Sequence, residues 1–342
     1  MRKLFLFFAA LTLSVGMWAE TRTVSYDYPV YNTPDDPKSG IASWQTGSVE
    51  ATVVEPSDEV VYWGEEGQES WYVVYSGGEL QLSKGAVCRG AVHLILTVGT
   101  LNASAENDKA GIEVSGSNSL TIYGDANLNA VGGSNGAGIG GGAQGNGSNI
   151  TINGGTVEAT GKNGGAGIGG GKNGSGSNIT INGGQVTAYS SGASACIGGG
   201  NGGNGTNIII NGGTVTTESG DGVAIGGGKD GQSSNIFAAT PILLKAGSTS
   251  DDAIETPHLT GYDIAAILKD KRYVKVEEGK AKPYAEGEAA GYARGKNDGI
   301  NEGKAALPTD PEGAAGHTVT ITKGDKTLIL VNPDKVTYGK QE

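Results

Sequence analysis

The polar side chains that could do chemistry recur in rows and form no catalytic cluster. Hydroxyl, amide and carboxyl groups return at matching positions of a repeated segment, and they are Thr151, Thr156, Glu158, Thr180, Gln185, Thr187, Thr214 and Thr216. Rows of such groups at the ~4.8 Å spacing of stacked strands can hydrogen-bond a repetitive polymer such as a glycan. These residues are the candidate glycan-facing positions, and an ordinary solvated sheet surface is the alternative interpretation.

Aromatic residues concentrate before the repeats. The stretch from Thr21 to Tyr75 contains Trp44, Trp63 and Trp71 together with six of the 13 tyrosines. Exposed aromatic rings stack on sugars, whereas buried ones fill a core. The three tryptophans are therefore either a sugar-stacking platform or the core of an N-terminal cap.

Residues for catalysis or metal binding are sparse. From Gly111 to Thr240 the chain has no His, Arg or Trp, and its nine charged residues fall on separate repeats. We predict no catalytic residues, no metal site and no cofactor, with calcium as the open alternative. A polysaccharide-cleaving enzyme would need a base and acidic ligands, for which only surfaces outside the repeat, near Arg22 and Arg89, are available.

A repeat of 28 or 29 residues organises the middle of the chain. The phrase Ile-Gly-Gly-Gly returns at Ile139, Ile168, Ile197 and Ile225, followed by Asn-Ile-Thr-Ile-Asn-Gly-Gly and its variants. Repeats of this length are typical of solenoids. Apolar residues alternate within each repeat, as strands require. One repeat contributes about four aliphatic side chains, each stabilising by roughly 1.5–3 kcal/mol, while ordering its residues costs on the order of 1.5 kcal/mol each. Single repeats therefore cannot fold alone, and the sequence predicts an all-β parallel β-helix.

Two further patterns give structural predictions. Asn153, Asn182 and Asn211 end successive strands, where asparagine can adopt left-handed backbone angles and hydrogen-bond its stacked neighbours. Cys88 and Cys196 lie about four coils apart, roughly 19 Å at ~4.8 Å per coil. Because a disulfide needs Cα atoms within about 7 Å, we predict two free thiols.

The segment from about residue 70 to residue 277 resembles a known group of proteins. The repeated Gly-Ala-Gly-Ile-Gly-Gly-Gly and Ile-Thr-Ile-Asn-Gly-Gly phrases are similar to those of pectin-lyase-type β-helices in secreted gut-bacterial proteins, some described as carbohydrate-binding. The resemblance implies a right-handed β-helix with capped ends and carbohydrate binding. No catalytic set of that group falls on these positions.

The sequence divides into five segments. Arg2 and Lys3 precede an apolar run, which predicts a signal peptide over residues 1–19. The next two segments are an aromatic-rich N-terminal cap over 20–75 and the β-helix with its C-terminal cap over 76–277. The last segment is a small β-hairpin over 317–342. Glycine at every fourth position within 278–316 indicates a linker, or a helix that self-associates through residues 284–305.

The net charge restricts the classes of binding partner. The net charge of −12 argues against nucleic acid and anionic membranes, which attract basic proteins. We predict no membrane insertion once the signal is removed. The sequence thus favours a non-catalytic protein, secreted or at the cell surface, that binds polysaccharide or a host or cell-surface glycan, or mediates adhesion. The alternatives are a structural spacer or assembly subunit, and a polysaccharide lyase or glycosidase.

Overall fold

The computed structural model describes residues 19–238, 242–259 and 262–278, together with three strands between residues 318 and 340. The chain divides into two units, Met1–Ala281 and Lys282–Glu342. The predicted signal peptide, apart from Ala19, lies outside the described residues. The linker or self-associating helix, including residues 284–305, lies outside them as well.

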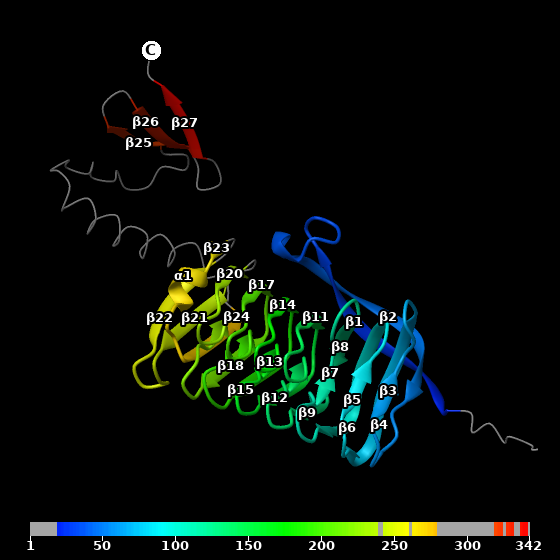
Figure 1. Ribbon diagram of the computed structural model, residues 1–342. Coiled ribbons are helices and arrows are strands. Elements are labelled where there is room, and N and C mark those ends of the chain that lie inside the picture. The colour runs from blue at the N-terminus through cyan, green and yellow to red at the C-terminus, as the bar shows by residue number, and fades with distance from the viewer. Residues whose placement is uncertain are drawn as a thin grey trace, which may run out of the picture. The chain divides into compact units, whose positions relative to one another are not determined.

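The first unit is a parallel β-solenoid of about six turns, as the repeat predicts. Figure 1 shows strands of successive coils lying side by side from cyan through green to yellow. Three faces run along it, which we call the short-strand sheet, the covered sheet and the open sheet. The short-strand sheet contains β3 (Val61–Trp63), β5 (Ala86–Cys88), β7 (Ile112–Glu113), β10 (Ile139–Gly140), β13 (Ile168–Gly169), β16 (Ile197–Gly198) and β19 (Ile225–Gly226).

The other two sheets meet at a corner in every coil. The first halves of two long strands, β4 (Glu69–Leu82) and β6 (Ala91–Ser104), belong to the covered sheet and their second halves to the open sheet. The covered sheet continues with β8 (Ser119–Gly124), β11 (Gly147–Ile152), β14 (Gly176–Ile181), β17 (Gly205–Ile210) and β20 (Ser233–Ala238). The open sheet continues with β9 (Asn127–Val131), β12 (Thr156–Gly161), β15 (Gln185–Ser190) and β18 (Thr214–Ser219).

Stacked isoleucines form the core, and the predicted interior row is confirmed. Ile139 pairs with Ile168, Ile168 with Ile197, and Ile197 with Ile225. All four are at most 1% exposed. Because each coil places its aliphatic side chains directly on those of the next, neighbouring coils supply the burial that one repeat lacks.

An N-terminal hairpin runs across the coils. It consists of β1 (Thr21–Tyr31), the short 3-10 helix η1 (Pro37–Ser39) and β2 (Ile41–Val53), and we call it the strap. Near its base, the Tyr26 ring packs against that of Tyr123 in β8. Near its tip, Asn211, which follows β17, donates a hydrogen bond to the carbonyl oxygen of Pro37. The strap therefore lies over the outer face of the covered sheet. The segment assigned to an N-terminal cap contains this strap and also β3 and the start of β4, where the solenoid begins.

The asparagine prediction is confirmed in part. Asn182 Nδ2 donates to Asn153 Oδ1, and Asn211 Nδ2 donates to Asn182 Oδ1, both at 2.8 Å. The prediction of left-handed backbone angles at Asn153, Asn182 and Asn211 is wrong. These angles occur instead at Asn149, Asn178, Asn207 and Asn235, whose φ lies between 52° and 59°. In the row of Asn153, the following turn is made by glycines with positive φ instead, at Gly155, Gly184 and Gly213.

Both cysteines are free and buried, as predicted. Cys88 ends β5 and Cys196 precedes β16, and four steps of the short-strand sheet separate these strands. Burial raises the pKa of both thiols, that of Cys196 to about 12. Protonated, enclosed thiols are chemically inert.

Antiparallel strands follow the last coil. They are β21 (Ile242–Gly247), β22 (Ile254–Leu259), β23 (Tyr262–Asp263) and β24 (Tyr273–Glu278). Between them lies a single helical turn, α1 (Ala265–Leu268). Because β24 pairs with β18 and β23 pairs with β20, these strands occupy the edge that another coil would have covered. In the second unit, β25 (Thr318–Lys323) and β26 (Lys326–Val331) form the expected hairpin, and β27 (Val336–Lys340) adds a third antiparallel strand.

Candidate functional site

The open sheet carries six of the eight predicted glycan-facing residues. Thr156, Glu158 and Gln185 are exposed, and Thr187, Thr214 and Thr216 are partly exposed. They form two straight rows along the solenoid. One row is Thr100, Asn127, Thr156, Gln185 and Thr214, and the other is Asn102, Asn129, Glu158, Thr187 and Thr216.

The two remaining threonines belong to the other face, and their assignment needs correction. Thr151 and Thr180 point outward from the covered sheet, beneath the strap, and Thr180 is only 7% exposed. A buried hydroxyl cannot reach a polymer in solution. Thr151 is half-buried and separated from the open sheet by the corner.

The three tryptophans have different environments. Trp63 is 1% exposed inside the solenoid, so it cannot be part of a sugar-stacking platform. Trp71 packs beneath the strap, with its ring centroid 4.6 Å from that of Tyr26. It belongs to the core between strap and covered sheet. Trp44, on β2, is 44% exposed. Of the predicted platform, Trp44 alone is placed to meet a ligand.

A groove lies beside Trp44, between the strap and the corner that joins the covered sheet to the open sheet. Its volume is about 540 Å³. The strap contributes Ser25, Tyr26, Asp27, Trp44 and Thr46, and the corners contribute Gly124, Asp125, Asn153, Gly183 and Gly184. Asp125 comes two residues before the polar row that contains Asn127, and Gly184 immediately precedes Gln185. The groove therefore opens onto the edge of the open sheet.

Local geometry fixes the groove walls. The Thr46 hydroxyl donates a 2.6 Å hydrogen bond to Asp27 Oδ1 across the two strands of the strap. A Cβ atom at Gly183 would lie 3.5 Å from the edge of the Trp44 ring, so an added methyl group would just reach van der Waals contact with the indole. Asn153 is held by the buried asparagine ladder. The groove is built from residues whose positions are set by the sheet and by the strap.

One polar cluster, around His93, was not predicted from the sequence. His93 stacks on Trp71 with centroids 4.1 Å apart, and its Nδ1 shares a 2.9 Å hydrogen bond with the hydroxyl of Tyr123. Glu69 Oε1 accepts a hydrogen bond from Trp71 Nε1 and lies 3.4 Å from His93 Nε2. Parallel register brings these residues together, because Trp71 pairs with His93 on adjacent strands.

This cluster has a structural role. Burial lowers the pKa of His93, opposed by the charge of Glu69, while burial raises the pKa of Tyr123. The imidazole is therefore neutral and the phenol protonated near neutral pH. The cluster lies beneath the strap, with Tyr26 packed against both Trp71 and Tyr123. It fastens the strap to the first coils.

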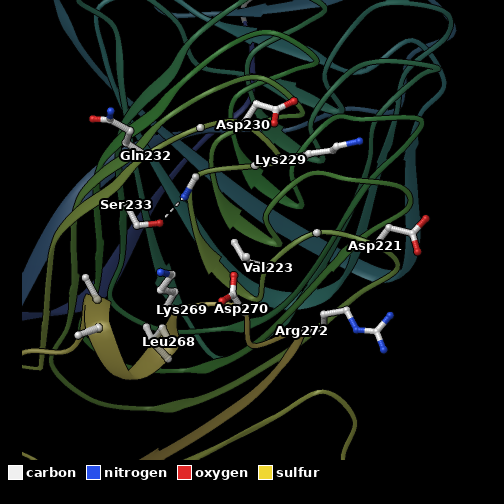
Figure 2. A pocket seen from close by; sticks show the side chains of 16 residues that line it. Asp221, Val223, Lys229, Asp230, Gln232, Ser233, Leu268, Lys269, Asp270 and Arg272 are labelled. Atoms are coloured by element: carbon white, nitrogen blue, oxygen red, sulfur yellow. Dashed lines mark hydrogen bonds between the residues drawn. The ribbon is translucent and has the colours of Figure 1, made fainter.

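A second cavity, of about 740 Å³, lies at the end of the last coil beside α1. Figure 2 shows its charged side chains, with Asp221 and Arg272 on one side and Lys269 and Asp270 near α1. The lining includes three acidic and three basic residues, which are Asp221, Asp230, Asp270, Lys229, Lys269 and Arg272.

No nucleophile is activated in this cavity. The Ser233 hydroxyl accepts a hydrogen bond from the Gly227 amide at 2.9 Å (Figure 2). Among the described residues that line the walls, no histidine stands beside this hydroxyl as a base.

The described residues contain neither a metal-binding cluster nor a membrane-spanning helix. Across the described part of the chain, no three His, Cys, Asp or Glu side chains gather as metal ligands. Within the same residues, no helix has the length and apolar character needed to cross a bilayer.

Comparison with known proteins identifies the repeat. A family model described as "Beta helix repeat" matches residues 120–143, 150–172, 179–201 and 208–229. No curated protein and no solved structure matches the chain. The four matched segments coincide with four successive coils of the solenoid. The chain therefore carries a right-handed β-helix domain built from β-helix repeats.

Proposed function

We propose that this protein binds polysaccharide without cleaving it, through the open sheet and the groove beside Trp44. One observation carries the proposal: an exposed indole borders a groove that opens onto two straight rows of hydroxyl, amide and carboxyl groups. An indole provides a stacking surface for a sugar ring. Polar rows at ~4.8 Å intervals provide hydrogen bonds along an extended chain.

The rigidity of the open sheet supports binding. Thr156, Thr187, Thr214 and Thr216 are β-branched, which restricts their side-chain rotation. β12 and β15 pair with a strand on each side, and β18 pairs with β15 and, from Val215 onward, with β24. Because little side-chain freedom remains to be lost, the entropic cost of ordering these groups on a ligand is small.

The proposal excludes cleavage for a physical reason. Asp27 and Asp125 are the carboxyl groups of the groove, and both are exposed. Glycosidases keep one carboxyl group protonated, as burial of that group in an apolar pocket achieves. Binding therefore suits these groups better than acid catalysis.

The setting of this activity is also part of the proposal. We propose that the protein is exported, as the basic and apolar first residues suggest, and acts as a secreted or surface-located binder of polysaccharide or cell-surface glycan. Its acidic surface, with a net charge of −12, favours neither nucleic acid nor anionic lipid as a partner.

The test is retention on a panel of polysaccharides by affinity electrophoresis, with the products analysed for new chain ends. We expect retention of at least one polymer, no new reducing or unsaturated ends, and loss of most retention in Trp44→Ala. Tyr62→Ala is the matched control, because Tyr62 is an exposed aromatic residue, 54% exposed, outside the groove.

Three results would contradict the proposal. New chain ends would indicate a lyase or glycosidase. Retention that survives Trp44→Ala together with Gln185→Ala would place binding elsewhere. Absence of retention, combined with an oligomer that dissociates when residues 280–342 are deleted, would indicate a spacer or assembly subunit.

A further inference from the structure

We infer that the site takes uncharged polysaccharides and rejects polymers that bear uronic acids, an inference that rests on the function proposed above. Of the described residues that line the groove, two are carboxylates, Asp27 and Asp125, and none is Lys, Arg or His. The two acids come from opposite walls, Asp27 from the strap and Asp125 from a corner of the solenoid. A ligand in the groove meets negative charge on both sides.

The open sheet extends the same polarity. Its described strands β4, β6, β9, β12, β15 and β18 contain Glu79, Glu158 and Glu218 on outward positions and neither Lys nor Arg. Basic residues occur on the neighbouring β24 and β21, where Lys275 is paired with Glu277 and Lys245 with Glu255. These cations are already neutralised by acids on adjacent positions, so they offer little attraction to an anionic polymer.

The hydrogen-bonding groups fit hydroxyl-rich sugars. Carboxylates accept hydrogen bonds from sugar hydroxyls, and the amides and threonine hydroxyls of the rows can both donate and accept. A uronate carboxylate donates no hydrogen bond and repels Asp27 and Asp125. Exposed like charges a few ångströms apart weaken binding, and salt screens the effect beyond about 10 Å at 0.1 M.

The experiment compares matched pairs of polymers that differ in carboxylation alone. β-Glucan is compared with β-glucan oxidised at C6 to the uronate, and polygalacturonate with its carboxyl-reduced form, by affinity electrophoresis at 20 and 300 mM NaCl. Any other polymer retained from the panel is converted in the same way. We expect the uncharged member of a pair to bind about fivefold or more tightly at low salt, with a smaller difference at high salt.

Variants assign the selectivity to the groove. D27N/D125N keeps the side-chain oxygen that accepts from Thr46 and removes both charges, so it should improve binding of the acidic member relative to the uncharged member at least threefold. E65Q/E66Q is the control, since it makes the same charge change on an exposed loop outside the groove, and the preference should persist.

The outcomes separate the two proposals. Equal or tighter binding of the acidic member at low salt overturns the inference while leaving polysaccharide binding intact. A preference that D27N/D125N does not change also overturns it, because the selectivity then has another source. Retention of neither member of any pair overturns the proposed function itself, and the inference with it.

Discussion

Removing the Asn182 side chain should destabilise the protein more than removing the side chain of an exposed asparagine. Asn182 is 2% exposed. Its Nδ2 donates to the Tyr31 hydroxyl in the strap and to Asn153 Oδ1, and its Oδ1 accepts from Asn211 Nδ2, each at 2.8 Å. One side chain thus joins three coils and the strap.

The magnitude follows from these three bonds. A buried hydrogen bond contributes about 0.5–1.5 kcal/mol net, and an orphaned buried partner costs about 1–3 kcal/mol. In Asn182→Ala, the Asn211 amide keeps its bond to the Pro37 carbonyl oxygen, and half-buried Tyr31 can turn toward water. We therefore expect a loss of about 2–4 kcal/mol in the free energy of unfolding.

Urea unfolding followed by circular dichroism measures this loss. Asn127→Ala is the control, because Asn127 is exposed and makes one 3.3 Å side-chain hydrogen bond to Thr100; it should cost below about 0.5 kcal/mol. A double-mutant cycle of Asn182→Ala with Tyr31→Phe should give a coupling of about 1 kcal/mol. Two results would show that the asparagine ladder does not hold the strap in place. One is an equal loss of unfolding free energy in Asn182→Ala and Asn127→Ala, and the other is a double-mutant cycle without coupling.

Three other perturbations test the interior and the strap base. Ile168→Ala, in the middle of the isoleucine row, should cost about 2–5 kcal/mol by urea unfolding, and a loss below 1 kcal/mol would show that the row is not closely packed. Gly169→Ala should reduce the yield of folded protein in expression trials, because φ is +134° and the new Cβ would lie 2.0 Å from the Gly198 carbonyl oxygen; normal yield and stability would contradict this register. Because the folded pKa of His93 lies below its ordinary value of about 6.5, the unfolded chain takes up the proton first, so stability should fall as pH drops below about 6.5. His93→Gln should flatten that part of the pH profile, and an unchanged slope would count against the assignment.

The interior was predictable from the sequence because it repeats. Ile139, Ile168 and Ile197 occupy one slot at a spacing of 29 residues, and parallel stacking converts equal spacing into direct contact. The free thiols follow from the same arithmetic, since Cys88 and Cys196 lie too many coils apart to meet. The spacing of residues in the sequence is enough to predict a contact wherever that contact joins one repeat to the next.

The strap was not predictable from that pattern. Asn182 bonds to Tyr31, 151 residues away, and no periodicity links the hairpin to the coils it covers. For this reason Thr180 and Gln185 look equivalent in sequence, although one is buried and the other exposed. The polar alternation identifies outward positions, and only the path of the strap decides which outward positions meet solvent.

The strap also explains why a binding site would lie at its edge. The covered sheet turns Val73, Ile95 and Tyr123 outward, and the strap buries all three. The inward residues of the hairpin, such as Tyr26 and Val49, pack against these side chains.

Trp44 stands on the other alternation of β2, in phase with the exposed Thr46 and Ser48. Stability does not require an indole there, because a 44% exposed ring gains only part of its burial energy. An aromatic side chain that borders a groove and a regular polar face fits the binding role that we propose for Trp44.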